Sequence, residues 1–216
     1  MAVQVLGFSG SPVRNSNTDR VVRHILEATG LTSEFIKLSE VTVRPCLACK
    51  RCVTDNVCKE DDDFPSLARQ IKDARAVVLG AYEPYGQIDA FTKALLERLW
   101  SFRHLANLLE GKILATVVIG LDEEQQERVN SALAEHLRDG VNMDLVGQLK
   151  VQGAYPCHTC GVGHRCKMVG VKAQYGSEAE LAEHPYIPAE GQEVWQEAEV
   201  LGRLIGERVR AMSTSP

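Results

Sequence analysis

The sequence lacks a long apolar run, a basic leader and an excess of basic residues. Its longest uncharged apolar stretch, Ile113 to Leu121, is far too short to cross a bilayer. No basic segment of the kind that opens a secretory signal occurs in Met1 to Gly10. Lys and Arg number 24 against 29 Asp and Glu, a net charge of −5 that argues against binding of a polyanion. We therefore expect a cytoplasmic protein with neither a membrane nor nucleic acid as partner.

Several catalytic motifs are missing as well. The chain has no Ser-His-Asp order, no His-Glu-x-x-His and no evident pair of glycosidase carboxylates, so hydrolysis has no visible machinery. Neither the Gly-x-Gly-x-x-Gly signature of dinucleotide-binding folds nor a glycine loop followed by Gly-Lys-Ser/Thr occurs. With 216 residues, 44% of them hydrophobic, the chain is expected to form a single domain over residues 1–216.

Short apolar runs alternate along the chain with segments in which apolar residues recur at intervals of four, as on one face of a helix. The runs are rich in β-branched residues and apolar on both faces, as in a parallel sheet that helices cover on both sides. The pattern predicts an α/β fold with an open, doubly wound, five-stranded parallel sheet. The expected strands lie near residues 3–8, 35–38, 76–80, 113–119 and 145–151.

The segment from Gly7 to Thr18 joins the first expected strand to the first expected helix and is rich in small and hydroxyl residues. Backbone N–H groups and hydroxyls can converge there on an anion at the start of the helix, and an arginine adds a positive charge. A phosphate group fits such a loop, although a simple helix cap by Ser16 is the alternative. The candidate ligand-binding residues are Ser9, Ser11, Arg14, Ser16, Asn17 and Thr18.

This string resembles the flavin-phosphate loop of the NADPH-dependent FMN reductase family, which has a flavodoxin-like fold. The resemblance covers residues 2–151 and continues in a second loop, 82–87, and in the helix expected over 91–98. It implies that FMN is the cofactor and that the second loop binds its isoalloxazine ring. The family typically has Pro-x-Tyr-x-Gly in this loop, whereas this chain departs from that order. Its residues here are Tyr82, Glu83, Pro84, Tyr85, Gly86 and Gln87.

Seven cysteines occur in two groups, and an odd number of thiols without a leader disfavours a disulfide framework. The first group lies in a cysteine-rich loop at residues 40–63 and consists of Cys46, Cys49, Cys52 and Cys58. Four thiols so close together suit a [4Fe-4S] cluster, while zinc and free thiols are the alternatives. Within the flavodoxin-like fold, the arrangement resembles the iron-sulfur flavoproteins, in which such a cluster passes electrons to FMN.

The second group lies in an irregular excursion expected at residues 153–188, which is rich in Gly, Cys and His. Cys157, Cys160 and Cys166 fall within ten residues, and His164 is the favoured fourth ligand because Gly161 and Gly163 let the chain turn back. A second metal centre is expected here. Three interpretations of this group are possible: a zinc ion, a second iron-sulfur centre, or free thiols.

These observations predict an FMN-dependent oxidoreductase that transfers electrons through an iron-sulfur cluster. The resemblance implies ferredoxin as the electron donor and a homodimer or homotetramer as the assembly. The alternatives are an NAD(P)H-dependent flavin or quinone reductase with structural cysteines and a non-enzymatic electron carrier. Because the cysteine loop follows the second strand and the second flavin loop follows the third, we expect cluster and flavin at the same edge of the sheet.

Overall fold

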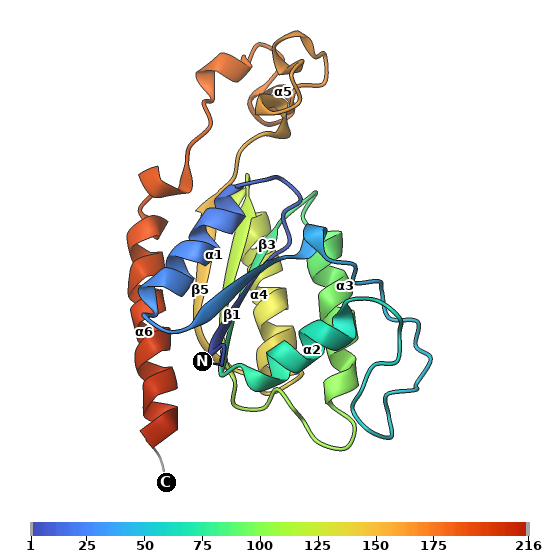
Figure 1. The fold of residues 1–216 in the computed structure, drawn as a ribbon. Coiled ribbons are helices and arrows are strands. Elements are labelled where there is room, and N and C mark those ends of the chain that lie inside the picture. The colour runs from blue at the N-terminus through green and yellow to red at the C-terminus, as the bar shows by residue number, and fades with distance from the viewer. Residues whose placement is uncertain (1, 215–216) are drawn as a thin grey trace.

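Five parallel strands form one sheet at the centre of the protein, in the order β2-β1-β3-β4-β5 (Figure 1). The computed structural model describes residues 2–214. All four pairings between neighbouring strands are parallel, which confirms the expected α/β, flavodoxin-like topology. The strands are β1 (Val5–Ser9), β2 (Ser33–Lys37), β3 (Ala76–Tyr82), β4 (Ile113–Gly120) and β5 (Asp144–Gln152).

Helices cover both faces of the sheet and divide the core into two layers. Alternate residues of each strand face opposite layers, so that Leu6 packs in one layer and Val5 in the other. Helices α1 and α6 cover one face, and α2, α3 and α4 cover the other. These helices are α1 (Asn17–Ala28), α2 (Phe64–Asp73), α3 (Ala90–Arg98), α4 (Glu123–Arg138) and α6 (Val194–Thr214).

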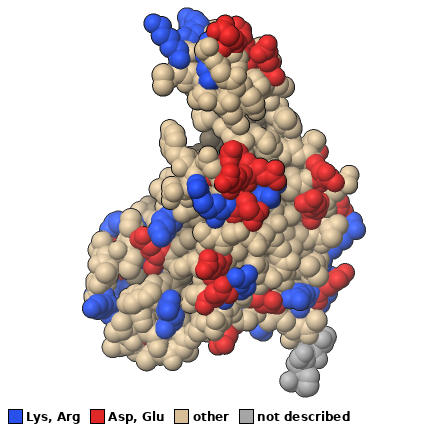
Figure 2. Space-filling model, turned by 180° about the vertical axis from the view of Figure 1, so that it is seen from behind, with Lys and Arg blue, Asp and Glu red and all other residues tan. Residues whose placement is uncertain are grey.

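Two irregular segments interrupt the alternation of strands and helices. A long loop runs from Val41 to Asp63, between a 3₁₀ turn (Leu38–Glu40) and α2, and it contains the first group of cysteines. The second segment, residues 153–193, lies between β5 and α6 and contains the short helix α5 (Gly170–Tyr175) and four 3₁₀ turns. We call this segment the C-terminal lobe; it projects beyond the carboxyl ends of the strands (Figures 1 and 2).

Charged side chains of both signs are mixed on the surface of the protein (Figure 2). On the face drawn in Figure 2, Lys and Arg are interspersed with Asp and Glu, and no broad basic area is present there. Within residues 2–214, no helix is both long enough and apolar enough to cross a membrane.

Helices α1 and α6 approach each other closely because glycines stand where they meet. A Cβ atom at Gly202 would lie 2.5 Å from the carbonyl oxygen of Ile25, and one at Gly206 would overlap the carbonyl oxygen of Thr29. The obstacles are backbone atoms, which cannot rotate away as a side chain can. This contact therefore fixes α6, the element to which the C-terminal lobe returns.

We predict that Gly206→Ala destabilises the protein by about 1–3 kcal/mol, because overpacking outweighs the helical preference of alanine. Urea unfolding followed by circular dichroism measures the change. Gly191→Ala is the matched control, since a Cβ there meets no atom within 4 Å among the described residues. Equal or greater stability of Gly206→Ala would show that the two helices do not depend on this close approach.

Candidate functional site

The loop between β1 and α1 lies at the carboxyl edge of the sheet, where open α/β sheets bind their ligands. The Oγ of Ser16 accepts the N–H of Asp19 at 3.1 Å, and Oδ2 of Asp19 accepts the N–H of Ser16 at 3.3 Å. Ser16 is thus a helix cap, yet its hydroxyl proton can still be donated to a ligand. The N–H groups of Asn17 and Thr18 fall in the first turn, where a helix supplies no partner for them. This end of α1 can therefore bind an anion.

A buried ion pair between Asp19 and Lys37 stabilises the conformation of this loop. The Nζ of Lys37, at the end of β2, lies 2.6 Å and 2.8 Å from the two carboxylate oxygens of Asp19, and both side chains are at most 6% exposed. Lys37 also donates to the carbonyl oxygen of Val13 at 2.8 Å, and Ser9 donates to Asp19 at 2.6 Å. The network joins two strand ends, the loop and the helix. Because Ser9 gives its only hydroxyl proton to Asp19, its side chain has no proton left for an anion.

Asn17, another predicted ligand residue, ties the loop to the C-terminal lobe instead. Its amide Nδ2 donates to the carbonyl oxygens of Gln152 at 3.2 Å and Ile187 at 3.1 Å. Its Oδ1 accepts the hydroxyl of Tyr186 at 2.7 Å and the N–H of Ala189 at 3.0 Å. Both amide protons are used within the protein, so only the backbone N–H of Asn17 can serve a phosphate. The side chain of Asn17 thus positions the loop, and contact between Asn17 and a bound ligand stays a prediction.

The other predicted residues of the loop keep groups that can reach a ligand. Ser11 is buried and its Oγ accepts the N–H of Val13 at 3.3 Å, which leaves the hydroxyl proton to donate. Arg14 is exposed and precedes Asn15, whose positive φ of 51° turns the chain sharply toward α1. Thr18 is buried in the first turn. Ser11, Arg14 and Thr18 thus lie in the loop between β1 and α1 and in the first turn of α1.

The second predicted loop, Tyr82 to Gln87, connects β3 to α3 at the same edge. The carboxylate of Glu83 accepts the N–H of Gly86 and closes the turn, and burial raises the pKa of Glu83. Tyr85 has a positive φ of 58° and a fully exposed side chain. The left-handed backbone conformation is unfavourable for a residue other than glycine. The surrounding turn must therefore stabilise this conformation at Tyr85.

Gly10 brings the two loops into contact. A Cβ atom there would overlap the carboxylate of Asp89 and the hydroxyl of Thr92, the cap and the first turn of α3. Asp89 accepts the N–H and the hydroxyl of Thr92, both at 2.8 Å, and the N–H of Tyr82 at 3.2 Å. Burial raises the pKa of Asp89, and these hydrogen bonds oppose the rise. The first loop is therefore in contact with the N-terminus of α3.

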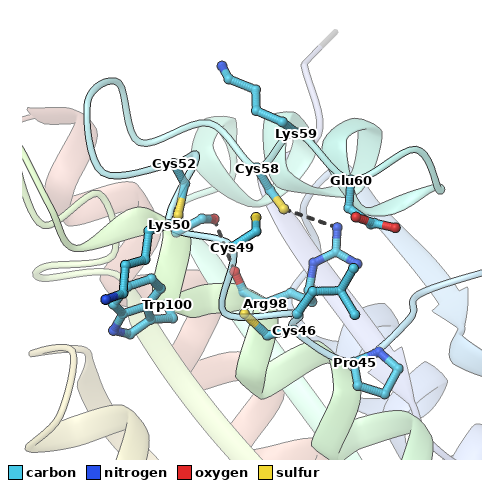
Figure 3. Close-up of a pocket in the computed structure, with 12 residues that line it drawn as sticks. Pro45, Cys46, Cys49, Lys50, Cys52, Cys58, Lys59, Glu60, Arg98 and Trp100 are labelled. Carbon is cyan, nitrogen blue, oxygen red and sulfur yellow. Dashed lines mark hydrogen bonds between the residues drawn. The ribbon is translucent and has the colours of Figure 1, made fainter.

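The four cysteines of the long loop line one small pocket (Figure 3). Arg98 and Trp100, at the end of α3 and in the turn after it, form the opposite wall. The pocket therefore lies at the far end of α3 from the Tyr82–Gln87 loop, a helix of nine residues or about 13 Å away. The expectation that thiols and flavin loops share one edge is wrong, because the chain after β2 runs back along the sheet before the first cysteine. The four cysteines are Cys46, Cys49, Cys52 and Cys58.

Several sulfur atoms of this pocket accept hydrogen bonds. The N–H of Ala48 lies 3.4 Å from Cys46 Sγ, and Arg51 Nε lies 3.4 Å from Cys49 Sγ. The bond from Arg51 lowers the pKa of Cys49, whereas burial raises that of Cys52. Donors of this kind stabilise sulfur in its charged form, which is the form that binds metals.

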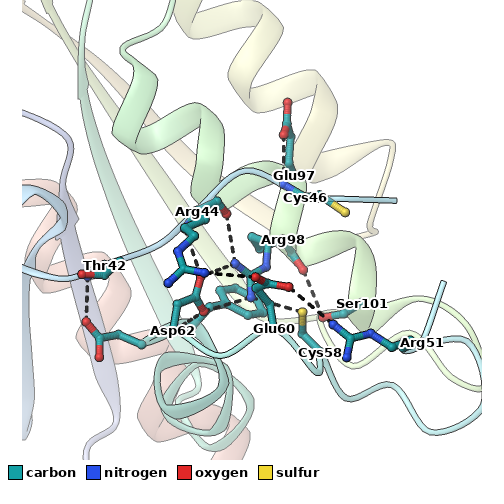
Figure 4. A network of polar contacts seen from close by, with 12 residues as sticks. Thr42, Arg44, Cys46, Arg51, Cys58, Glu60, Asp62, Glu97, Arg98 and Ser101 are labelled. Atoms are coloured by element: carbon teal, nitrogen blue, oxygen red, sulfur yellow. Dashed lines mark hydrogen bonds and ion pairs between the residues drawn. The ribbon is translucent and has the colours of Figure 1, made fainter. Parts of the chain in front are cut away.

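Arg98 anchors the pocket from inside the protein (Figure 4). Its guanidinium pairs with both carboxylate oxygens of Asp62, the second at 3.0 Å, and the two side chains are 1% and 0% exposed. It also donates to Cys58 Sγ at 3.2 Å and to the carbonyl oxygen of Arg44 at 3.0 Å. Burial opposes the charge of Asp62, but the bond from Arg98 holds its pKa below the usual range. Residues at both ends of the cysteine loop are thus bound to one buried cation.

Four thiols are suitable ligands for an inorganic centre. In this structure, however, their sulfur atoms are not spaced to hold one. Four thiols line the pocket, and the buried Nε of Arg98 has no hydrogen-bond partner among the described residues. The enclosed volume is only about 20 Å³, and within residues 2–214 no three Cys, His, Asp or Glu side chains are arranged to hold a metal ion. Binding of a centre would require the loop to open around it. The left-handed φ values of Ala48 (50°) and Lys50 (59°) show where this loop already turns sharply.

The second cysteine group lies in the C-terminal lobe, apart from both sites. Cys157 and Cys166 are half-buried and Cys160 is exposed. His164, the predicted fourth ligand, is also exposed.

Comparison with known proteins identifies the family. The family model for NADPH-dependent FMN reductase matches residues 3–154, and the chain belongs to this family. An iron-sulfur flavoprotein of Methanocaldococcus jannaschii is 31% identical over 121 residues, which cover 55% of this chain and 62% of the relative. One of Methanosarcina thermophila is 27% identical over 121 residues, or 55% of this chain and 63% of the relative. The chain thus matches less than two thirds of the length of these relatives.

Solved structures show the same fold at low sequence identity. RosB, crystallised with 8-demethyl-8-formylriboflavin-5'-phosphate, has a TM-score of 0.67 at 12% identity and covers 100% of this chain and 82% of its own. A WrbA-like flavodoxin of Agrobacterium tumefaciens has a TM-score of 0.53 at 10% identity and covers 98% and 99%.

We predict that Lys37→Met destabilises the protein by about 3–5 kcal/mol, because it leaves Asp19 buried without its cation. The loss of the bond to Val13 should also weaken FMN binding, measured by fluorescence titration. Lys112→Met is the control, because the Nζ of Lys112 donates to the backbone carbonyl oxygens of Lys72 and Ala74 rather than to the loop. Its stability can fall while its affinity for FMN stays unchanged. Unchanged stability and affinity in Lys37→Met would contradict the role given to the ion pair.

We predict that Arg98→Met costs about 3–5 kcal/mol near neutral pH, because Asp62 is left ionised and buried. Since Asp62 has a lowered pKa in the folded protein, the stability it contributes is present above about pH 4 and is lost as the pH falls through its folded value. The difference from wild type should therefore shrink in acid. Thermal unfolding between acid and neutral pH measures it, with exposed Arg103→Met as control. A difference that does not vary with pH would exclude Asp62 as the cause.

Proposed function

We propose that this protein is a cytoplasmic FMN-dependent oxidoreductase in which Cys46, Cys49, Cys52 and Cys58 hold a [4Fe-4S] cluster. The observation that carries the proposal is that four thiols of one loop line a single pocket in a chain of the FMN reductase family. The names of the iron-sulfur flavoproteins similar to it support the same conclusion.

The first loop is proposed to hold the FMN phosphate. The hydroxyl protons of Ser11 and Ser16 and the N–H groups at the start of α1 would bind the phosphate oxygens, with Thr18 beside them. Arg14 would add a charge-assisted hydrogen bond from the exposed side. Ser9 and Asn17 would act by holding the loop in shape, through Asp19 and through the C-terminal lobe.

The second loop is proposed to bind the flavin ring. Residues Tyr82 to Gln87 lie at the same edge of the sheet as the phosphate loop, and the lack of a side chain at Gly10 lets the first loop lie against Asp89. Tyr85, fully exposed on a strained turn, offers an aromatic face, and the bond from Gly86 to Glu83 fixes that turn. When bound here, FMN supplies the capacity to exchange one or two electrons.

The cysteine loop is proposed to hold the cluster rather than zinc. Three of its cysteines fall within seven residues, which suits the corners of one cube, whereas most four-cysteine zinc sites are made of two separated pairs. The N–H groups of Ala48, Arg51 and Arg98 that point to sulfur would lower the cost of the negative charge on the ligands.

The separation of the two sites favours an assembly in which they meet across an interface. The thiol pocket and the flavin loops lie at opposite ends of α3 in one copy. Two apolar side chains that line the pocket are exposed, Leu47 at 65% and Trp100 at 38%. Leu105, whose N–H donates to Asn56 of the cysteine loop, is exposed at 69%. We propose that a homodimer or homotetramer covers these side chains and brings the pocket of one copy to the flavin of another.

Reduced ferredoxin is the electron donor that this proposal favours, because a protein donor passes electrons one at a time and an iron-sulfur cluster accepts them one at a time. The family description favours a second candidate, NAD(P)H-dependent flavin reduction with the cysteines in a structural role.

We predict that anaerobically purified protein contains one FMN and about four irons and four sulfides per chain. Cys49→Ser should lose the iron and sulfide but keep FMN, and its flavin should no longer be reduced by ferredoxin. Anaerobic absorption spectroscopy with ferredoxin or NADPH as donor measures both effects. Zinc without sulfide would exclude the cluster, and rapid reduction by NADPH alone in both proteins would favour the second candidate. Redox cycling without turnover of any acceptor would indicate an electron carrier.

We predict that Arg14→Ala weakens FMN binding by about 1.5–3 kcal/mol if Arg14 makes a charge-assisted contact with the phosphate. Equilibrium titration of the flavin-free protein gives the affinity, and Arg69→Ala, an exposed arginine on α2, is the control. The same affinity in Arg14→Ala and wild type would remove Arg14 from the site.

A further inference from the structure

The C-terminal lobe, residues 153–193, has too little apolar core to order itself. Its own buried cluster is centred on Tyr155, Val169 and Val171 alone, and Ala189 is buried against the core of the sheet domain instead. Large apolar side chains of the lobe are exposed, including Met168 at 87% and Tyr175 at 56%. A segment of this size with so few buried side chains usually needs a crosslink or a metal ion to hold one conformation.

Two of the three sulfur atoms lie beside this small core and accept backbone hydrogen bonds. The N–H of Gly170 lies 3.2 Å from Cys157 Sγ, and the N–H of Met168 lies 3.3 Å from Cys166 Sγ. Cys157 and Cys166 both pack against the buried cluster. These hydrogen bonds hold both sulfur atoms in place beside the buried cluster.

The chain between these cysteines folds back on itself. Gly161 has a positive φ of 77°, directly after Cys160, and a Cβ at Gly163 would lie 2.5 Å from the carbonyl oxygen of Cys157. The N–H of Cys166 then bonds to the carbonyl oxygen of Gly163 at 3.3 Å. The reversal returns Cys166 toward the turn that contains Cys157 and Cys160.

Two histidines lie within the segment from Cys157 to Cys166 and compete for the place of a fourth ligand. The Nε2 of His158 lies 2.8 Å from the carbonyl oxygen of His184, so this nitrogen is already used. His164 is exposed and lies on the reversal itself, in the 3₁₀ turn Gly163–Arg165. His164 is therefore the better placed of the two.

We propose that Cys157, Cys160, Cys166 and His164 bind one divalent, thiophilic metal ion of the zinc class, and that this ion orders the C-terminal lobe. Three cysteines and one histidine form a common structural zinc set, and the first pair has the spacing Cys-x2-Cys. Binding breaks three S–H bonds, forms three sulfur–metal bonds and releases three protons to solvent, and no electron moves. Within residues 2–214 no three Cys, His, Asp or Glu side chains are arranged to hold a metal ion, and the thiol of Cys160 donates to the carbonyl oxygen of Cys157 at 3.4 Å. The sulfur atoms must therefore converge when the ion binds, so that metal binding and ordering of the lobe are coupled. The lobe lies beyond residue 154, where the match to the family ends.

The first test uses the full chain with its FMN and adds Zn²⁺ alone, followed by gel filtration and elemental analysis. We expect wild type and Thr159→Ser to retain one more equivalent of zinc than Cys160→Ser, with equal FMN in all three. His164→Asn should weaken zinc binding more than about tenfold, while His158→Asn should change it far less. Equal zinc in wild type and Cys160→Ser would overturn the proposal.

A second test uses only the wild-type chain and so does not depend on how a variant folds. Alkylation followed by mass spectrometry reports each cysteine separately, with Zn²⁺ or with a chelator. We expect Zn²⁺ to protect all three lobe cysteines together and to slow proteolysis within residues 153–188. Alkylation unaffected by Zn²⁺, a disulfide between two of these cysteines, or iron with sulfide bound to them would each overturn the assignment. Iron and sulfide at the first cysteine group are measured in the same samples, so failure here is distinguishable from failure of the proposed function.

Discussion

The buried ion pair between Asp19 and Lys37 is the interaction on which the carboxyl edge of the sheet depends. Two charges that are almost completely removed from water are tolerated only when they are paired and hydrogen-bonded, and here Ser9 and Ser16 complete the bonding of the carboxylate. The pair joins β1, β2 and α1, and through Val13 it holds the loop between them. The shape of the loop thus exists before any ligand binds, which lowers the entropy lost on binding.

The cysteine loop is also stabilised by a buried ion pair, which lies at the other end of α3. Arg98 and Asp62 are a second buried pair, and Arg98 extends from it to a carbonyl oxygen and to a thiol. In a segment without helix or strand, such a fixed cation gives the cysteines a defined place. The C-terminal lobe has no comparable pair of buried charges among its described residues. This difference is why a metal ion is proposed to hold the lobe.

The sheet and most helices could be predicted because their pattern is local. Residues 76–80 and 113–119 are apolar apart from Thr116, and they form central strands buried on both faces. Lys37 could not be found in this way, because its partner lies eighteen residues earlier and only the pairing of β1 with β2 brings them together. One local signal was available for Asp19: it follows Ser16 by three residues, as in a capping box. The place of the cysteine pocket was mistaken, since eight residues from Leu38 to Cys46 can extend about 26 Å.

In the proposed assembly, the flavin site of one copy works with the cysteine pocket of another. This arrangement is tested most directly by co-expressing two differently tagged inactive variants, Arg14→Ala and Cys49→Ser, and isolating the mixed assembly by both tags. We expect ferredoxin-dependent flavin reduction, which is absent or weak in each variant alone, to return in the mixed assembly. No recovery in a mixed assembly that contains both FMN and iron-sulfur cluster would contradict this arrangement.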